Sequence, residues 1–213
     1  MERRPSRGRP REYDPGQALA AALGEFRRRG YTATSLDHLS EATKMARPSL
    51  YAAFGNKLEI YRKAVRQYAD QSAGRRMHAL FDEPSLHKGL DDYVGEIVGA
   101  YVSEEGEPLG CPILSVISGE AAADPEIGAD LAAGVEKTDT QFRRRMRVAA
   151  DAGEISVDTD IAGLAAMLAA LQHSLALRAR AGESRPKLLE IARSYVALAL
   201  KAAGYAGSET AQR

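Results

Sequence analysis

The sequence predicts an all-α protein of about nine helices, arranged as a small N-terminal unit and a larger C-terminal body. Leucine and alanine dominate an apolar fraction that makes up 45% of the 213 residues, and both favour helix over strand. Glycines, prolines and short polar residues stand where the expected helices begin and end. The charge divides in the same way. Residues 1–57 contain 11 Lys and Arg and 6 Asp and Glu, a net charge of +5, whereas residues 58–213 contain 18 and 23, a net charge of −5. A basic unit joined to an acidic body suits a protein that reads DNA with one part and is regulated through the other.

Residues 1–13 are expected to form a disordered basic arm, because arginines there lie among prolines and a glycine. The segment Arg7-Gly8-Arg9-Pro10 resembles the core of an AT-hook, whose arginines lie in a narrow A·T-rich minor groove. We therefore expect Arg7 and Arg9 to contact DNA. A tail that only improves solubility is the alternative.

The first helix is expected over residues 15–29. Asp14 can cap it, Pro15 suits the first helical position, and Gly30 ends it. Its last turn is basic, which is favourable at the negative end of the helix dipole. One apolar face is expected to lie in a core and carries Ala18, Leu19, Ala22, Leu23 and Phe26.

Two short helices joined by a tight turn follow. Thr34 stands three residues before an acidic residue, which is the pattern of a helix N-cap. Helical spacing of apolar residues then stops at residues 43–46, where Met45 is expected to fill the gap between the helices. The second short helix, residues 47–54, begins there because Pro48 is tolerated only in a first turn.

This second helix is about two turns long, which is too short to be stable without its neighbours. Leu50 and Phe54 face inward at a spacing of four, so the remaining side chains face solvent. We expect the outward face to enter the major groove of DNA, with contacts from Arg47, Pro48, Ser49 and Tyr51.

The next helix is expected to begin at residue 57. Gly55 ends the preceding helix, and Asn56 with Glu59 three residues later forms a capping box. Lys57 lies in the first turn, where a cation opposes the helix dipole, so we expect it to have an anionic partner. A DNA phosphate is the natural candidate. An ordinary three-helix packing unit with solvated charges is the alternative.

Together these residues resemble the DNA-binding signature of the tetracycline-repressor (TetR) family of bacterial regulators. The resemblance covers about the first quarter of the chain, with glycine–aromatic, Leu-Tyr, Phe-Gly and lysine residues at the family spacing. The segments that carry it are Gly30-Tyr31, Ala33-Thr34-Ser35-Leu36, Leu50-Tyr51, Phe54-Gly55-Asn56-Lys57 and Ile60-Tyr61.

The resemblance implies an all-helical homodimer that represses transcription from a palindromic double-stranded DNA operator and is released by a small-molecule inducer. It implies a helix-turn-helix DNA-binding domain over residues 14–56 and a ligand-binding and dimerisation domain over residues 57–204. Residues 205–213 are expected to form a flexible tail.

The resemblance also assigns DNA contacts by position. Two positions depart from the family, since Ala46 stands where a capping serine is frequent and Ala53 where histidine or tyrosine is frequent. The first departure weakens a helix cap and the second removes one backbone contact. The assigned residues are Arg47, Ser49 and Tyr51 for bases or phosphates, and Thr34, Ser35 and Lys57 for phosphates.

The helices of the body follow from apolar spacing and from their end signals. A loop rich in glycine and acidic residues separates the second and third of them. The expected ranges are 57–80, 86–102, 110–122, 125–152, 158–181 and 184–203.

The last two helices are unusually apolar. Leucines form one stripe of the first, and a small-residue face of Ala165, Ala169 and Ala176 lies beside it. Two adjacent helices of this kind need partners on more than one side. We expect them to form a homodimer interface with two helices from each subunit, and burial in the chain's own core is the alternative.

A small-molecule pocket is expected between the helices of the body. Cys111 is the only thiol, and a free cysteine is usually a small buried hydrophobe. At a helix N-terminus it can also react, which makes a thiol-based sensor of oxidants or electrophiles the alternative function. The candidate pocket residues are Tyr68, Met77, Tyr101, Cys111, Met146 and His173.

Other classes of protein are disfavoured by what the sequence lacks. It has no nucleophile elbow, phosphate-binding glycine loop, HExxH motif or paired metal ligands, so we expect no enzyme, cofactor or metal. A helical enzyme and an adaptor without a DNA role are the least favoured functions. No apolar run approaches the 18 or so residues that span a bilayer, and a single cysteine fits a reducing cytoplasm.

Overall fold

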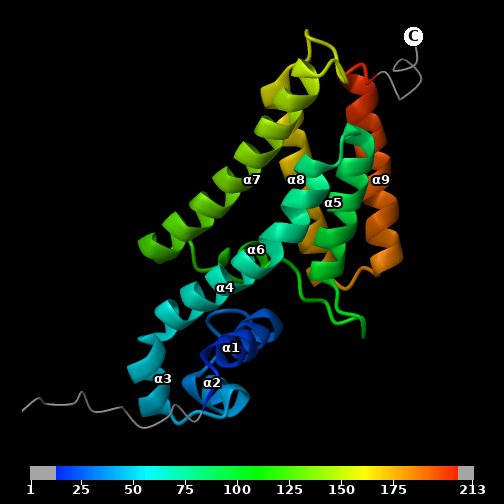
Figure 1. The fold of residues 1–213 in the computed structure, drawn as a ribbon. Coiled ribbons are helices and arrows are strands. Elements are labelled where there is room, and N and C mark those ends of the chain that lie inside the picture. Colours follow the sequence, from blue (N-terminus) through cyan, green and yellow to red (C-terminus); the bar gives the residue numbers. More distant parts are fainter. Residues whose placement is uncertain (1–12, 206–213) are drawn as a thin grey trace, which may run out of the picture.

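The computed structural model describes residues 13–205, and within that range the predicted all-α fold is confirmed (Figure 1). The β-structure described within these residues is one isolated antiparallel bridge, between Val102 and Pro108. The regular elements are α1 (Pro15–Arg29), α2 (Leu36–Thr43), α3 (Arg47–Phe54), α4 (Lys57–Met77), the π-helical turn η1 (His78–Asp82), α5 (Leu86–Tyr101), α6 (Leu114–Ile117), α7 (Pro125–Asp151), α8 (Ile161–Arg180) and α9 (Arg185–Ala202).

The first core lies among α1, α2 and α3, which we call the head. Phe26 and Leu50 are fully buried in it, as helical spacing predicted, and so is Leu39 of α2. The same core also takes in residues from outside the head, so its apolar side chains do not stop at the end of α3. These are Ile60 and Tyr61 of α4, Val116 and Ile117 of α6, and Ile127 of α7.

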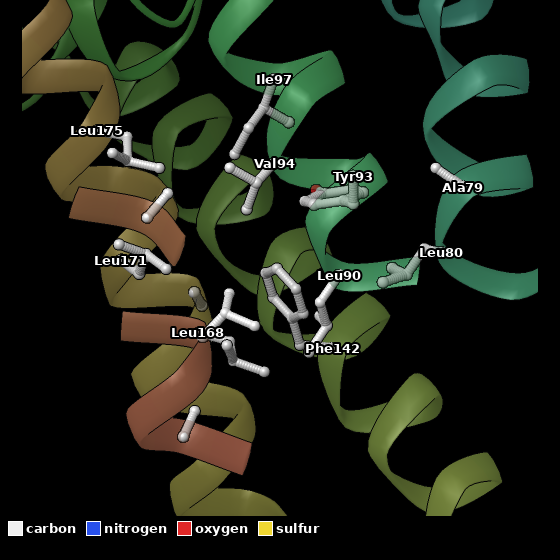
Figure 2. Close-up of a cluster of buried hydrophobic side chains, with 14 of the residues drawn as sticks. Ala79, Leu80, Leu90, Tyr93, Val94, Ile97, Phe142, Leu168, Leu171 and Leu175 are labelled. Atoms are coloured by element: carbon white, nitrogen blue, oxygen red, sulfur yellow. The ribbon is translucent and has the colours of Figure 1, made fainter. Parts of the chain in front are cut away.

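The second core lies in the body, which we define as α5 to α9. Helix α8 packs against both α7 and α9, and α9 also packs against α5. Figure 2 shows Tyr93 and Phe142 among the leucines of α8, with the two ring centroids 5.4 Å apart in an edge-on arrangement. Helix α4 runs from the head to this body, and so it connects the two cores (Figure 1).

Most of the predicted helix ends are confirmed. Asp14 accepts hydrogen bonds at the start of α1, and Asn56 and Glu59 form the capping box of α4. The predicted cap of α2 is wrong by one residue, because Ser35 and not Thr34 is the N-cap. Ser35 accepts from the backbone N–H of His38, and the His38 ring accepts in return.

Two helices, α4 and α6, end earlier than predicted. Helix α4 stops at Met77 and passes into η1, which turns Ala79 and Leu80 into the body core. This close packing depends on Gly89, since a side chain there would lie 2.9 Å from the Ala79 carbonyl oxygen. Helix α6 is a single turn of four residues, and irregular turns fill residues 118–123 where a longer helix was expected.

Helix α8 corrects the expectation that no apolar segment approaches the length needed to span a bilayer. It is long and apolar enough, by length and composition alone, to cross a membrane, with a mean hydropathy of 1.3 over its most apolar window. That window is 44% buried inside the fold, and α8 packs against α7 and α9. Core helices of globular proteins have the same composition.

Candidate nucleic-acid interface and cavity

Helix α3 presents one polar face to solvent and buries the other. Leu50 and Phe54 hold it to the core of the head, while Arg47, Pro48 and Ser49 are exposed. Tyr51 is 46% exposed, which is unusual for a large aromatic side chain with a core beside it. The four outward residues predicted to meet DNA therefore lie together on one solvent-facing surface, which we call the reading face.

The beginning of α3 is also open to an anion. Its N-cap, Ala46, makes no side-chain hydrogen bond, as the departure from the family pattern predicted. The first backbone N–H groups of a helix have no partner within the helix, and with the helix dipole they favour a negative group. A DNA phosphate can take the place of the missing cap.

Arg47 has a protein partner in the absence of DNA. Its guanidinium pairs with the Asp37 carboxylate, with Nε 2.7 Å from Oδ1, and this pairing lowers the pKa of Asp37. Both side chains are more than half exposed. Ion pairs this exposed contribute little to stability, so Arg47 can exchange Asp37 for a phosphate or a base.

The three predicted phosphate ligands differ in their surroundings. Thr34 is fully buried and its hydroxyl donates to the Gly30 carbonyl at 2.7 Å, so the prediction that it binds phosphate is wrong. Ser35 is exposed, but its hydroxyl already caps α2. Lys57 donates to the Thr32 carbonyl at 3.3 Å and lies 4.6 Å from the centre of the Tyr31 ring.

Lys57 therefore has a different partner from the one predicted. The Tyr31 ring and a carbonyl stabilise its charge, and partial burial lowers its pKa. An ammonium group has three donor hydrogens, so one contact with a phosphate stays compatible with this geometry. Arg7 and Arg9 of the predicted arm lie outside the described residues.

A cavity of about 110 Å³ lies between α4, α5, α6, α7 and α8. Five of the six predicted pocket residues line it, namely Tyr68, Met77, Tyr101, Cys111 and His173. Met146 is the exception, because it is fully buried in the body core and does not line the cavity. Polar residues that the sequence did not single out also line it, including Arg76, Lys137 and Gln141. Lys137 and Gln141 are four residues apart on α7 and so share one face of that helix. This spacing is the feature of the sequence from which their common position could have been predicted.

The polar groups of the cavity are unevenly satisfied. The Tyr93 hydroxyl donates to the Gln172 side chain at 2.7 Å, and burial raises the pKa of Tyr93 to about 12. The Tyr101 hydroxyl is buried and has no hydrogen-bond partner among the described residues. Burial lowers the pKa of the half-buried His173 imidazole, which favours its neutral form. A bound molecule with a hydrogen-bonding group would satisfy Tyr101.

Comparison with known proteins gives the family. One family model, described as bacterial regulatory proteins of the tetR family, matches residues 18–64, and another, the tetracyclin repressor-like C-terminal domain, matches residues 93–196. The HTH-type transcriptional repressor ComR of Escherichia coli is 36% identical over 197 residues, which are 88% of this chain and 89% of ComR. The chain belongs to the TetR family. It is a DNA-binding transcriptional regulator and not an enzyme, as predicted.

Solved structures of TetR regulators agree with this assignment. A cysteine mutant of the regulator CifR, complexed with 26-base-pair operator DNA, is 32% identical with a TM-score of 0.82, and the match covers 89% of this chain and 98% of CifR. A putative TetR regulator from Rhodococcus is 28% identical with a TM-score of 0.59, covering 85% of this chain and 97% of that one. Within the described residues, no group of three or more His, Cys, Asp or Glu side chains is placed to hold a metal ion.

Proposed function

We propose that this TetR protein is a ligand-responsive transcriptional repressor that binds a palindromic operator as a homodimer. The observation that carries the proposal is the reading face, an exposed polar surface on an uncapped two-turn helix held by a buried core. The structure of CifR with operator DNA, of similar sequence and fold, supports binding of double-stranded DNA by this chain. Base contacts are assigned to Arg47, Ser49 and Tyr51.

The proposed dimer interface is the exposed apolar face of α8 and α9. Four large apolar side chains remain exposed there, at 39% for Met167, 56% for Leu177, 50% for Tyr195 and 64% for Leu198. The predicted small-residue face of Ala165, Ala169 and Ala176 is buried inside the chain, so the outer face of α8 is a different one. Exposed apolar residues collected on two neighbouring helices mark an interaction surface, and a twofold dimer gives each a partner.

The dimer proposal is tested by a charge on this face. Leu198→Glu is expected to give a monomer in analytical ultracentrifugation and to weaken binding to a palindromic duplex by at least about tenfold, because one head alone loses the second half-site. Val148→Glu is the matched control, since Val148 is 46% exposed on α7, away from the proposed interface. A dimeric Leu198→Glu protein with unchanged affinity would exclude this interface.

The proposed inducer site is the cavity of the body. Its lining combines apolar side chains with a few polar ones, so a small, mostly apolar molecule with one hydrogen-bonding group suits it. Such a ligand acts by its higher affinity for the form of the protein whose heads do not match the operator. Since DNA binding and a single free thiol both fit the reducing interior of a cell, we place the protein in the cytoplasm, with no role at a membrane.

Electrophile or oxidant sensing is the second candidate function, because the single thiol lines this cavity. Cys111 is half-buried and lies one residue beyond Gly110, at the start of the segment that leads into α6. A reagent that reaches the cavity would therefore modify one defined position. The adduct would occupy the same space as a reversible inducer.

Cys111→Ser separates these two functions. The variant is expected to bind operator DNA normally but to resist release by thiol-reactive compounds such as N-ethylmaleimide, which release the unmodified protein. Electrophoretic mobility shift with and without the reagent measures this, with mass spectrometry to count adducts. Equal release of both proteins would eliminate the sensing function while leaving reversible induction possible.

A further inference from the structure

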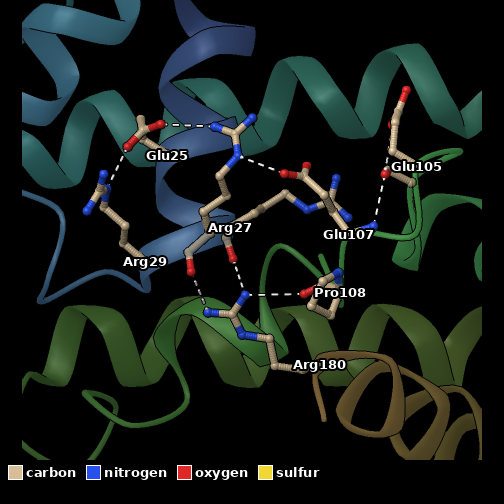
Figure 3. Close-up of polar contacts among 9 residues, drawn as sticks. Glu25, Arg27, Arg29, Glu105, Glu107, Pro108 and Arg180 are labelled. Carbon is tan, nitrogen blue, oxygen red and sulfur yellow. Dashed lines mark hydrogen bonds and ion pairs between the residues drawn. The ribbon is translucent and has the colours of Figure 1, made fainter. Parts of the chain in front are cut away.

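Two arginines join the head to the body through backbone carbonyl groups. Arg27 lies in the last turn of α1, and Arg180 in the last turn of α8. Figure 3 shows them at the junction, where Arg180 reaches the end of α1 and the loop before α6. From its place in the sequence, Arg27 was expected only to provide a favourable charge at the end of its own helix.

Arg27 caps a helix of the body. Its side chain is 8% exposed, and Nη2 donates to the carbonyl oxygens of Ala100 at 2.5 Å and Gly110 at 2.7 Å. Ala100 lies in the last turn of α5, whose final carbonyls have no partner within the helix. The neighbouring Tyr101 carbonyl accepts from the Gly110 N–H at 2.9 Å. Arg27 thus brings a cation to the negative end of α5.

Arg180 makes the reciprocal contact. Its guanidinium donates to the carbonyl oxygens of Arg27 and Arg28, the latter at 3.0 Å, and to the Pro108 carbonyl at 3.3 Å. Arg27 and Arg28 lie in the last turn of α1, so their carbonyls are likewise without partners inside that helix. The end of α1 is therefore capped by α8, while the end of α5 is capped by α1.

These contacts fix an orientation better than the surface ion pairs beside them. Arg28 and Arg29 pair with Glu25 of the same helix and are about half exposed. Arg28 also reaches Glu107 of the loop after α5 at 3.5 Å, but both of these side chains are about half exposed, and such ion pairs contribute little. A planar guanidinium that bonds two or three carbonyls of a helix end and its adjoining loop constrains both distance and angle. Arg27 is buried without a carboxylate partner among the described residues, so its charge depends on the Ala100 and Gly110 carbonyls and on the Tyr68 ring, whose centre lies 5.5 Å from Cζ.

We propose that Arg180, together with Arg27, sets the angle between each head and the dimer helices, and so sets the operator half-site spacing that the protein accepts. The inference rests on the proposed dimer through α8 and α9, because Arg180 belongs to α8 and contacts the head directly. Other head-to-body bonds go to different parts of the body, such as that from the Thr32 hydroxyl to the Glu120 carboxylate, between α6 and α7, at 2.6 Å. Arg180 supplies the hydrogen bonds that run from α8 to the head.

The required change in angle is small. Helix α4 has 21 residues and is therefore about 32 Å long, so a tilt of roughly 6° moves one end by about 3.4 Å, the rise of one base pair. Two heads on one face of DNA meet half-sites about 34 Å apart. A shift of one base pair also turns the half-site by about 34° around the DNA axis, so the head has to twist as well as tilt. A looser junction lowers the cost of both movements, which reduces the preference for one spacing.

The experiment measures affinity for a set of palindromic duplexes whose half-sites are moved apart or together by one and two base pairs. The unmodified protein is expected to prefer one spacing, and Arg180→Met is expected to reduce that preference roughly tenfold. Arg178→Met is the control, since the side chain of Arg178, near the same end of α8, bonds Ser174 and Glu183 and no head residue within residues 13–205. Sedimentation and thermal melting are measured on every variant.

The outcomes separate the inference from the proposed function. A monomeric unmodified protein overturns both. A dimeric unmodified protein that binds operator DNA without a preferred spacing overturns the inference alone. A dimeric Arg180→Met protein that keeps the full preference, or that loses affinity equally at every spacing, overturns the inference alone. If Arg180→Met does not fold, Arg180→Lys is judged by the same criterion, because lysine keeps the charge but cannot bridge three carbonyls in a plane.

Discussion

Phe26→Ala is expected to lower the free energy of unfolding by about 3–5 kcal/mol, the usual cost of removing a buried aromatic ring. Phe26 is fully buried in the core of the head, stacked on Tyr31 at 5.8 Å and edge-on to Tyr61 at 5.3 Å. Removing its ring leaves a space that the surrounding helices can close only in part. Chemical denaturation followed by circular dichroism measures the loss.

The expected loss of stability in Phe26→Ala depends on the Phe26 ring lying at the centre of the core of the head. Phe26→Leu, which keeps most of the apolar volume, is expected to cost much less, and DNA binding should survive in it. Leu19 lies on the same helix and is half-buried. The loss of stability in Leu19→Ala is therefore expected to fall between the losses in Phe26→Ala and Phe26→Leu. A Phe26→Ala protein as stable as Phe26→Leu would show that the head repacks freely and does not hold α3 rigidly.

Tyr51→Ala is expected to weaken operator binding by roughly 1–3 kcal/mol, or about 5- to 150-fold, and to relax the preference for one base pair. The side chain lies on the reading face and is 46% exposed, so its loss should leave thermal stability nearly unchanged. Fluorescence anisotropy on the operator and on single-base variants measures both effects. Tyr51→Phe distinguishes the hydroxyl from the ring.

Arg47→Ala gives the matched comparison for that prediction. An arginine that contacts a phosphate contributes to the salt dependence of binding, so its removal should reduce the slope of log K against log salt by about 0.9. Tyr51 carries no charge, and its removal should leave the slope unchanged. If Tyr51→Ala bound all duplexes as the unmodified protein does, α3 would not be the recognition helix in the form proposed.

The head was predictable because its signals are local. Asp14 before Pro15, Pro48 in a first turn, and Asn56 three residues before Glu59 each define a helix boundary within four residues of sequence, and the structure confirms them. Thr34 shows the limit of this reasoning. Thr34 and Ser35 are both good capping residues, and the acidic residue after Thr34 favoured the wrong one, because His38 completes the capping box instead.

The junction and the cavity depend on distant contacts, which local patterns do not contain. Arg27 bonds carbonyls 73 and 83 residues away, and a carbonyl has no side-chain identity that a sequence can show. Met146 illustrates the same limit within the body. It was predicted to line the pocket, but it lies in the solid core beside the cavity, and the sequence does not distinguish these two positions.

The shared apolar core of the head has a consequence for exchanging parts between relatives. Val116, Ile117 and Ile127 come from the body but are buried with Phe26 and Leu50 of the head. A chimaera joined after α3, or even midway along α4, would place foreign side chains against that core. A functional chimaera has to take the α6 turn and the start of α7 from the same parent as the head. The DNA-binding unit that can be exchanged between relatives is therefore discontinuous along the chain.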